Sequence, residues 1–245
     1  MTTTSPYERQ QSARRPPTTA PGAGWDGRTL LACAGLIGSV VFAVWLHLGP
    51  GRSLNPVRRT ISDYVLVDGG AALFDGSVLC LVIGSAAVLA GLTGSGLTRG
   101  SRRTGIPLGA GCMALLLVVL FPTDPPGSPS SVYGLVHRYA GAVAFASLPL
   151  TGLLLVDLPR NPTCQGPIRR VRLLSQASAA GVVLFFATHL GATYPDFAGA
   201  KLVGSALGLT ERLLLCMEIA LLYSLADLVR LGRRPGSASR RGGSL

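Results

Sequence analysis

The residues of this chain that could do chemistry are three histidines and a small set of acids, arginines and hydroxyls. His47, His137 and His189 are the only imidazoles among 245 residues, and imidazole nitrogen is a common zinc ligand and a general acid or base near neutral pH. They are far apart in the chain, and neither H-x-x-x-H nor H-E-x-x-H occurs. A site that used all three would therefore need several elements of the fold to bring them together.

Other polar residues gather in four short stretches of the sequence. These are LNPVRRTISDY (54–64), FPTDPPG (121–127), the pair His137–Arg138 and the pair Glu211–Arg212. A guanidinium group binds phosphate or carboxylate through several hydrogen bonds, and neighbouring carboxylates can orient it. From these stretches the candidate ligand-binding residues are Asn55, Ser62, Asp63, Asp124, His137, Arg138, Glu211 and Arg212. Two acids elsewhere in the chain, Asp75 and Glu218, are added to them.

The composition indicates which elements must position these residues. Charged residues make up 13% of the chain and apolar residues 48%, whereas soluble domains carry about 25% charged residues. This balance argues against a water-soluble domain and against a charged disordered chain. A span of the hydrocarbon core needs about 20 apolar residues, and the chain has six such runs, at 29–48, 73–92, 105–121, 134–156, 173–190 and 209–229.

These runs lack the alternation of apolar and polar residues that marks barrel strands. A helix, in contrast, pairs all its backbone N–H and C=O groups within one segment, as lipid requires. The sequence therefore predicts an all-α fold, a polytopic membrane helix bundle with six transmembrane helices in one domain, 29–231. The segments 1–28 and 232–245, rich in Ser, Gly, Pro and Arg, are expected to be disordered cytoplasmic tails. The first run exceeds a signal-peptide core and has no clear small-residue cleavage site, so we expect a retained helix.

The arginines set the expected orientation. The net charge is +11, and Lys201 is the only lysine among 22 basic residues. Sixteen of the 22 lie in the two tails and in the loops after the second and fourth runs, against six elsewhere. The positive-inside rule then places both termini in the cytoplasm of a multi-pass protein of the cell membrane. Because the arginines form short clusters between apolar runs, we expect membrane lipids as partners and no nucleic acid.

This orientation brings the three histidines and most of the acids to the outer side. His47 ends the first predicted helix, His137 begins the fourth and His189 ends the fifth, while Asp75 begins the second and Asp124 follows the third. We therefore expect an outward-facing polar pocket at the top of the bundle.

Several candidates also have a purely structural interpretation. Ser62 and Asp63 could cap a short interfacial helix, Asp124 could form an Asx turn between prolines, and the His137–Arg138 pair could anchor its helix at the interface. Glu218 lies inside the last run, where a carboxylate costs at least about 2.5 kcal/mol. It belongs either to a functional site or to a structural hydrogen bond between helices.

NPVRRTISDY (55–64), FPTD (121–124), GLVH (134–137) and the Glu211–Arg212 pair resemble the motifs of a family of prokaryotic membrane proteins, the domain-of-unknown-function family nine-nine-eight. The resemblance covers roughly Leu30 to Leu231, and the Arg-rich, Lys-poor composition is similar to that of high-GC actinobacteria. It implies a six-helix inner-membrane protein and no particular activity. The matched positions, which would line a common site, are Ser62, Asp63, Asp124, His137 and Arg212.

Three functions follow as hypotheses. The first is binding of a lipid headgroup or a small polar molecule in the outer pocket. The second is a membrane-embedded, metal-dependent hydrolase whose zinc is held by His47, His137 and His189. The third is an interaction subunit without chemistry of its own. The sequence identifies no cofactor and no catalytic residue.

Overall fold

The computed structural model describes residues 26–94, 102–156, 165–194, 196 and 199–232, and within these ranges the chain is all α-helical, with no strand. The six long helices are α2 (Gly27–Leu48), α3 (Gly70–Gly94), α4 (Gly105–Leu120), α5 (Val132–Val156), α6 (Gln165–Thr193) and α8 (Leu207–Gly232). The shorter elements are α7 (Ala200–Gly204) and the 3-10 helices η1 (Pro50–Ser53), η2 (Ser62–Leu66) and η3 (Arg102–Thr104). The predicted helical bundle is therefore confirmed.

One predicted boundary differs clearly from the structure. The fifth apolar run was expected at 173–190, but α6 begins at Gln165. The added turns contain Arg169, Arg170 and Arg172, which favour helix as much as leucine does, so the helix extends past the apolar run. The ends of the other five long helices lie within three residues of the predicted limits.

The helices have the length and surface of membrane spans. Four of them, α2, α3, α5 and α6, are long and apolar enough to cross a bilayer, and α4 is a shorter apolar helix. Large apolar side chains point away from the bundle, among them Ile37 at 63% exposure and Val183 at 69%. Soluble proteins rarely expose so much apolar surface, and these helices have the length of membrane spans, so the chain is a multi-pass membrane protein.

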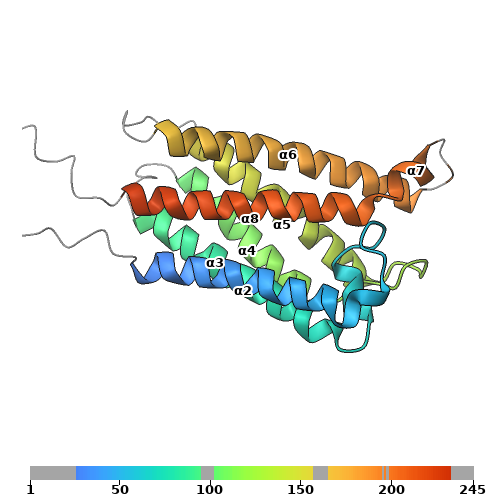
Figure 1. Cartoon of the computed structure of the whole chain (residues 1–245). Helices are drawn as coiled ribbons and strands as arrows, with labels where there is room; N and C mark the ends of the chain where they lie inside the picture. The colour runs from blue at the N-terminus through green and yellow to red at the C-terminus, as the bar shows by residue number, and fades with distance from the viewer. Residues whose placement is uncertain (1–25, 95–101, 157–164, 195, 197–198, 233–245) are drawn as a thin grey trace, which may run out of the picture.

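Successive long helices run in opposite directions (Figure 1). The start of α2 and the end of α8 therefore lie at the same end of the bundle, which we call the tail end. The connections 49–69 and 121–131 and the short helix α7 lie at the opposite end, which we call the loop end (Figure 1). Most of the candidate residues come from the loop end.

Close backbone contact joins α2 to α3. A Cβ atom on Gly35 would fall 2.6 Å from the backbone nitrogen of Gly84, so only glycine fits at this crossing. One turn further on, the Ser77 hydroxyl donates to the carbonyl of Ser39 at 2.9 Å. Where lipid weakens the hydrophobic drive between helices, such small residues and interhelical hydrogen bonds hold the packing.

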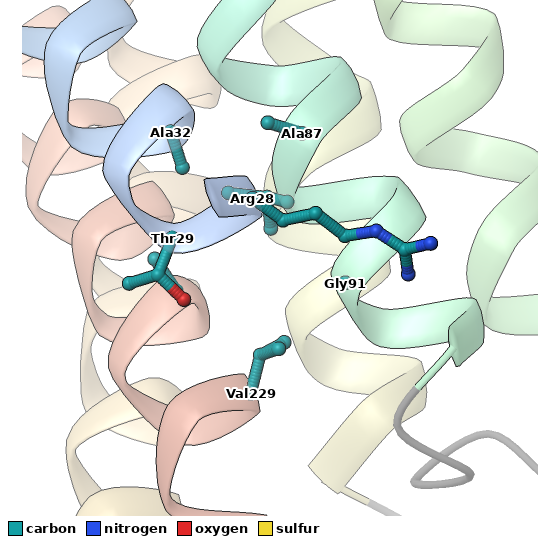
Figure 2. A pocket seen from close by; sticks show the side chains of 8 residues that line it. Arg28, Thr29, Ala32, Ala87, Gly91 and Val229 are labelled. Atoms are coloured by element: carbon teal, nitrogen blue, oxygen red, sulfur yellow. The ribbon is translucent and has the colours of Figure 1, made fainter. Parts of the chain in front are cut away.

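At the tail end, α2, α3 and α8 meet around a very small cavity. It has a volume of about 10 Å³, and its lining includes Thr29, Gly91 and Val229, which Figure 2 shows from close by. The Arg28 side chain reaches across from α2 and donates to the carbonyl of Ala90 near the end of α3, at 3.1 Å. This cavity has room for one water molecule at most, so it is a packing gap and no ligand site.

Candidate functional site

The loop end is organised around the guanidinium group of Arg212, in the second turn of α8. Its Nε donates to Nε2 of His47 at 3.0 Å, and its Nη2 donates to the Tyr64 hydroxyl at 3.0 Å. Its Nη1 donates to the carbonyls of Arg59 and Gly208, both at 2.8 Å. These four hydrogen bonds, which we call the arginine clamp, tie α2, the connection 49–69 and α8 together.

The hydrogen bonds of His47 indicate which of its ring nitrogens carries a proton. Nδ1 of this ring lies 2.6 Å from the carbonyl of Ala43, one helical turn earlier, which can only accept a hydrogen bond. Nδ1 therefore carries the proton, and Nε2 accepts from Arg212 with its lone pair. The ring also packs on Tyr64, with 4.9 Å between ring centroids. In this arrangement the Nε2 lone pair of His47 is engaged by Arg212 and is not open to a metal ion.

Tyr64 is the residue of this site that the sequence analysis missed. It is 1% exposed, and its ring centroid lies 5.5 Å from the central carbon of the Arg212 guanidinium, in cation–π contact. The available signal for Tyr64 was its place at the end of a polar, arginine-containing motif. Aromatic and apolar residues are common in loops, however, and nothing in the sequence distinguishes Tyr64 from them.

Glu211, beside Arg212, holds the same connection at a second point. It is 6% exposed, and its Oε2 accepts a hydrogen bond from the backbone nitrogen of Ile61 at 2.5 Å. This backbone N–H lies just before η2, where no helical carbonyl can serve it. The Glu211–Arg212 pair therefore fixes both the entry to η2 and the middle of the connection.

Ser62 and Asp63 form the first turn of η2, whose N-cap residue is Ile61. Asp63 Oδ2 accepts from the backbone nitrogen of Thr60 at 3.1 Å, and the hydroxyls of Thr60 and Ser62 lie 3.0 Å apart. No side-chain hydrogen bond caps η2. The Asp63 carboxylate therefore holds the turn that leads into η2 and does not cap the helix.

The connection lies directly on the first turn of α8. The backbone nitrogen of Leu209 donates to the carbonyl of Val57 at 3.0 Å, and a Cβ atom on Gly208 would overlap the carbonyls of Arg59 and Pro56. Asn55 is exposed, and its Oδ1 accepts from the nitrogen of Val57 at 2.9 Å. Asn55 is therefore a turn-forming residue of this segment.

Asp124 joins the second connection of the loop end to the start of α5. Its two carboxylate oxygens accept from the Ser131 hydroxyl at 2.6 Å and from the Ser131 backbone nitrogen at 2.9 Å. The same hydroxyl lies 3.1 Å from the nitrogen of Gly134 and caps the helix. The hydroxyl, the backbone N–H and, further off, Arg138 and His137 hold the pKa of Asp124 below its ordinary value.

This shift predicts a pH-dependent contribution to stability. Since the folded-state pKa of Asp124 is lowered, its contribution is complete above the unfolded value of about 3.9 and is lost as the pH falls through the folded value. We expect Asp124→Asn to lower the melting temperature in detergent at pH 7, and the difference from the wild type to shrink at about pH 3. A difference that stayed constant between the two pH values would contradict the assignment.

His137 locks α4 to α5. It is 8% exposed, and its Nδ1 lies 2.7 Å from the carbonyl of Phe121 and 3.2 Å from that of Val118. These carbonyls belong to the last turn and the C-cap of α4, where no later N–H serves them. His137 is a buried cap, and Arg138 beside it is exposed.

The remaining candidates lie apart from the clamp. The carboxylate of Asp75, in the second turn of α3, makes no hydrogen bond to any other residue that the structure describes. His189 on α6 packs against Phe185, with 6.2 Å between ring centroids. Glu218 lies seven residues beyond Glu211 on α8, about 10 Å deeper in the bundle.

The three histidines are not brought together as a zinc site. Within the described ranges, no group of three or more His, Cys, Asp and Glu side chains could hold a metal ion. His47, His137 and His189 instead contact Arg212, the end of α4 and Phe185, respectively. A zinc site made of these three histidines, as the hydrolase hypothesis requires, is therefore absent from the described residues.

The comparisons with known proteins give one result. A family model described as a protein of unknown function (DUF998) matches residues 22–227. No curated protein and no solved structure matches the chain.

Proposed function

This chain belongs to DUF998, a family of proteins of unknown function, and we propose that it is a six-span protein of the cell membrane whose loop end faces outward and binds anionic lipid headgroups. The resemblance seen in the sequence motifs is thereby confirmed at the level of the family. The proposed activity rests on the geometry of the loop end.

Helix number and arginine placement support the topology. The described part of the chain has six long antiparallel helices (Figure 1), and seven of its described arginines belong to the tail end, namely Arg28, Arg102, Arg103, Arg169, Arg170, Arg172 and Arg230. α4 has 16 residues, about 24 Å of helix, and α8 has 26 residues, about 39 Å. α8 can cross despite Glu211, Arg212 and Glu218 because these side chains lie inside the bundle or at its end.

The observation that carries the headgroup proposal is a hydrogen-bonded segment whose arginines are exposed. Arg52, Arg58 and Arg59 are exposed, and in the described part of the chain no hydrogen bond or ion pair engages their side chains. The clamp holds the backbone next to Arg59, so little backbone entropy is lost when these side chains bind a phosphate group. We call these three residues the arginine face.

The connection 49–69 carries three arginines against two acids, Asp63 and the exposed Asp68, so it keeps one positive charge in excess. Asp63, Asp124 and Glu211 each accept hydrogen bonds within the protein, from Thr60, Ser131 and Ile61. Exposed aromatic side chains occur near the same end, at Trp45 on the last turn of α2 and at Tyr133 on the first turn of α5, with 65% and 59% exposure. Such residues mark the headgroup level of a bilayer.

The test is retention of anionic lipid by purified protein, measured by native mass spectrometry after titration with phosphatidylglycerol. The variant R52Q/R58Q/R59Q should bind the lipid about a hundredfold more weakly, a loss of about 3 kcal/mol, since each of the three arginines contributes about 1 kcal/mol near an anionic surface. The matched control is R169Q/R170Q/R172Q, which removes three exposed arginines from the tail end of α6 and should change retention less than threefold, roughly.

Two outcomes would contradict the proposal. Equal losses in both triple variants would mean unspecific attraction between charge and lipid. No bound lipid in the wild type would favour the interaction-subunit hypothesis. Competition by soluble glycerol phosphate at low concentration would identify a free small molecule as the source of the phosphate chemistry.

A further inference from the structure

A carboxyl group without a partner lies in the middle of the bundle. Glu218 on α8 is 8% exposed, and its Oε1 is buried with no hydrogen-bond partner among the described residues. Leaving a buried acceptor unpaired costs about 1–3 kcal/mol, and more when the group is charged. The arginine clamp does not use this residue, and a purely structural hydrogen bond at Oε1 would have placed a donor there.

The same carboxyl lines a cavity. The cavity has a volume of about 40 Å³ and is bounded by α3, α4, α5 and α8. Ser85 on α3 and Ser147 on α5 contribute hydroxyls to its wall, and most of the rest is apolar, including Leu115 and Phe145. One water molecule needs about 10–15 Å³ measured in this way, so the space could hold about three, close to polar partners.

No basic side chain lines this cavity, and the groups of α2 that could be positive, Arg28 and His47, lie at the two ends of that helix, which also packs on α8. Of the side chains that line the cavity from α3, α4, α5 and α8, only Glu218 and the Cys112 thiol can ionise, and none is basic. α6 also packs on α8, and its contribution at this depth is a hydroxyl, as the helix register indicates.

Two contacts fix that register. Ser175 and Leu221 both border Gly152, and Gly181 lies against Leu214 and Met217. Because α6 and α8 are antiparallel (Figure 1), Ser178 is level with Glu218. The hydroxyl of Ser178 is itself buried and lacks a hydrogen-bond partner within the described residues. Two unpartnered polar groups therefore occur at one depth of the bundle.

We propose that this cavity holds water and that the Glu218 carboxyl binds a proton there that exchanges with solvent. The carboxyl needs a partner at Oε1, the cavity has room for water, and no basic side chain supplies a counter-charge. A bound proton removes the charge, and water supplies the missing hydrogen bonds. The site is independent of the arginine face, so either proposal can fail without the other.

Proton binding at this site would make the packing of the four helices depend on pH. Release of the proton places a single negative charge among four packed helices, and only proton return or a conformational change can relieve it. Glu218 would then be the residue through which a proton gradient acts on this protein.

The first experiment is infrared spectroscopy of the full-length protein in lipid vesicles. The difference spectrum between the wild type and Glu218→Gln should contain the carbonyl stretch of a protonated carboxylic acid, and this band should shift after transfer to D₂O. The matched control, Glu211→Gln, changes the other buried glutamate of α8 and should leave the Glu218 band in place. Absence of the band, or a band that does not shift in D₂O, would overturn the proposal.

A second measurement does not depend on a variant that folds. Dicyclohexylcarbodiimide partitions into membranes and converts protonated carboxyl groups to stable acylureas. In wild-type vesicles it should modify Glu218 in preference to Asp227, which peptide mass spectrometry reads directly. Sodium chloride should leave the labelling rate unchanged within about twofold. Strong suppression by sodium would identify a metal cation as the ligand, and modification of Asp227 without Glu218 would exclude a protonated Glu218, so either result contradicts the proposal.

Discussion

Replacing Arg212 by methionine is expected to cause the largest loss of stability of any single change at the loop end. The substitution removes four hydrogen bonds and leaves His47 Nε2, the Tyr64 hydroxyl and two carbonyls without their donor. A loss of about 3 kcal/mol is expected, because each buried group left unpaired costs about 1–3 kcal/mol and water reaches some of them. This corresponds to a fall in melting temperature of about 6–12 °C for a chain of this size.

The measurements are thermal unfolding in detergent and limited trypsin digestion. Without the clamp the connection should loosen, and trypsin should cut faster after Arg58. Arg212→Lys should recover only part of the stability, because an ammonium group cannot reach all four acceptors in the geometry of the guanidinium fork. Arg52→Gln is the control, since Arg52 is exposed on the same connection and should change stability by less than about 0.5 kcal/mol. If Arg212→Met behaved like Arg52→Gln, the clamp would not hold the connection.

Glu211→Ala is expected to have the second largest effect. It leaves the backbone N–H of Ile61 without its acceptor and empties space in a buried position, for a loss of about 2 kcal/mol. Glu211→Gln keeps an acceptor oxygen in the same place and should retain most of the stability.

Hydrogen–deuterium exchange measures the effect of Glu211→Ala at single backbone amides. The amide of Ile61 should exchange much faster in Glu211→Ala than in the wild type, and Glu211→Gln should lie close to the wild type. The amide of Ser131, whose acceptor is Asp124, is a reference at the same end of the bundle. Faster exchange at both amides would mean general loosening and would contradict a local role of Glu211.

The positions of the six long helices could be predicted from the sequence because bilayer thickness sets the length of an apolar run. The true start of α6 at Gln165 could not, since the arginines of its first turns favour helix but interrupt the apolar pattern. The short helices η1 and α7 have too few residues to show the repeat of apolar residues that marks a helix or a strand in a sequence.

The candidate site was predictable only in part. A short helix at Ser62 and Asp63 follows from local spacing, and the structure contains it as η2, but its N-cap is Ile61 and no side chain caps it. The partners of Arg212 are 148 or more residues away in the chain or are backbone carbonyls, and a carbonyl has no residue type to detect. Four of the five N–H groups of Arg212 donate to the protein itself, whereas the exposed arginines at 52, 58 and 59 keep theirs for a ligand.

The central claim is that the loop end, with its arginine face, lies on the outer side of the cell membrane. Cysteine accessibility tests it most directly, with the native cysteines replaced by alanine and one cysteine placed at exposed Ser53 or at exposed Gln165. In intact cells, a membrane-impermeant maleimide should label Ser53→Cys and should label Gln165→Cys only after the membrane is permeabilised. The reverse pattern would place the arginine face in the cytoplasm and contradict the account.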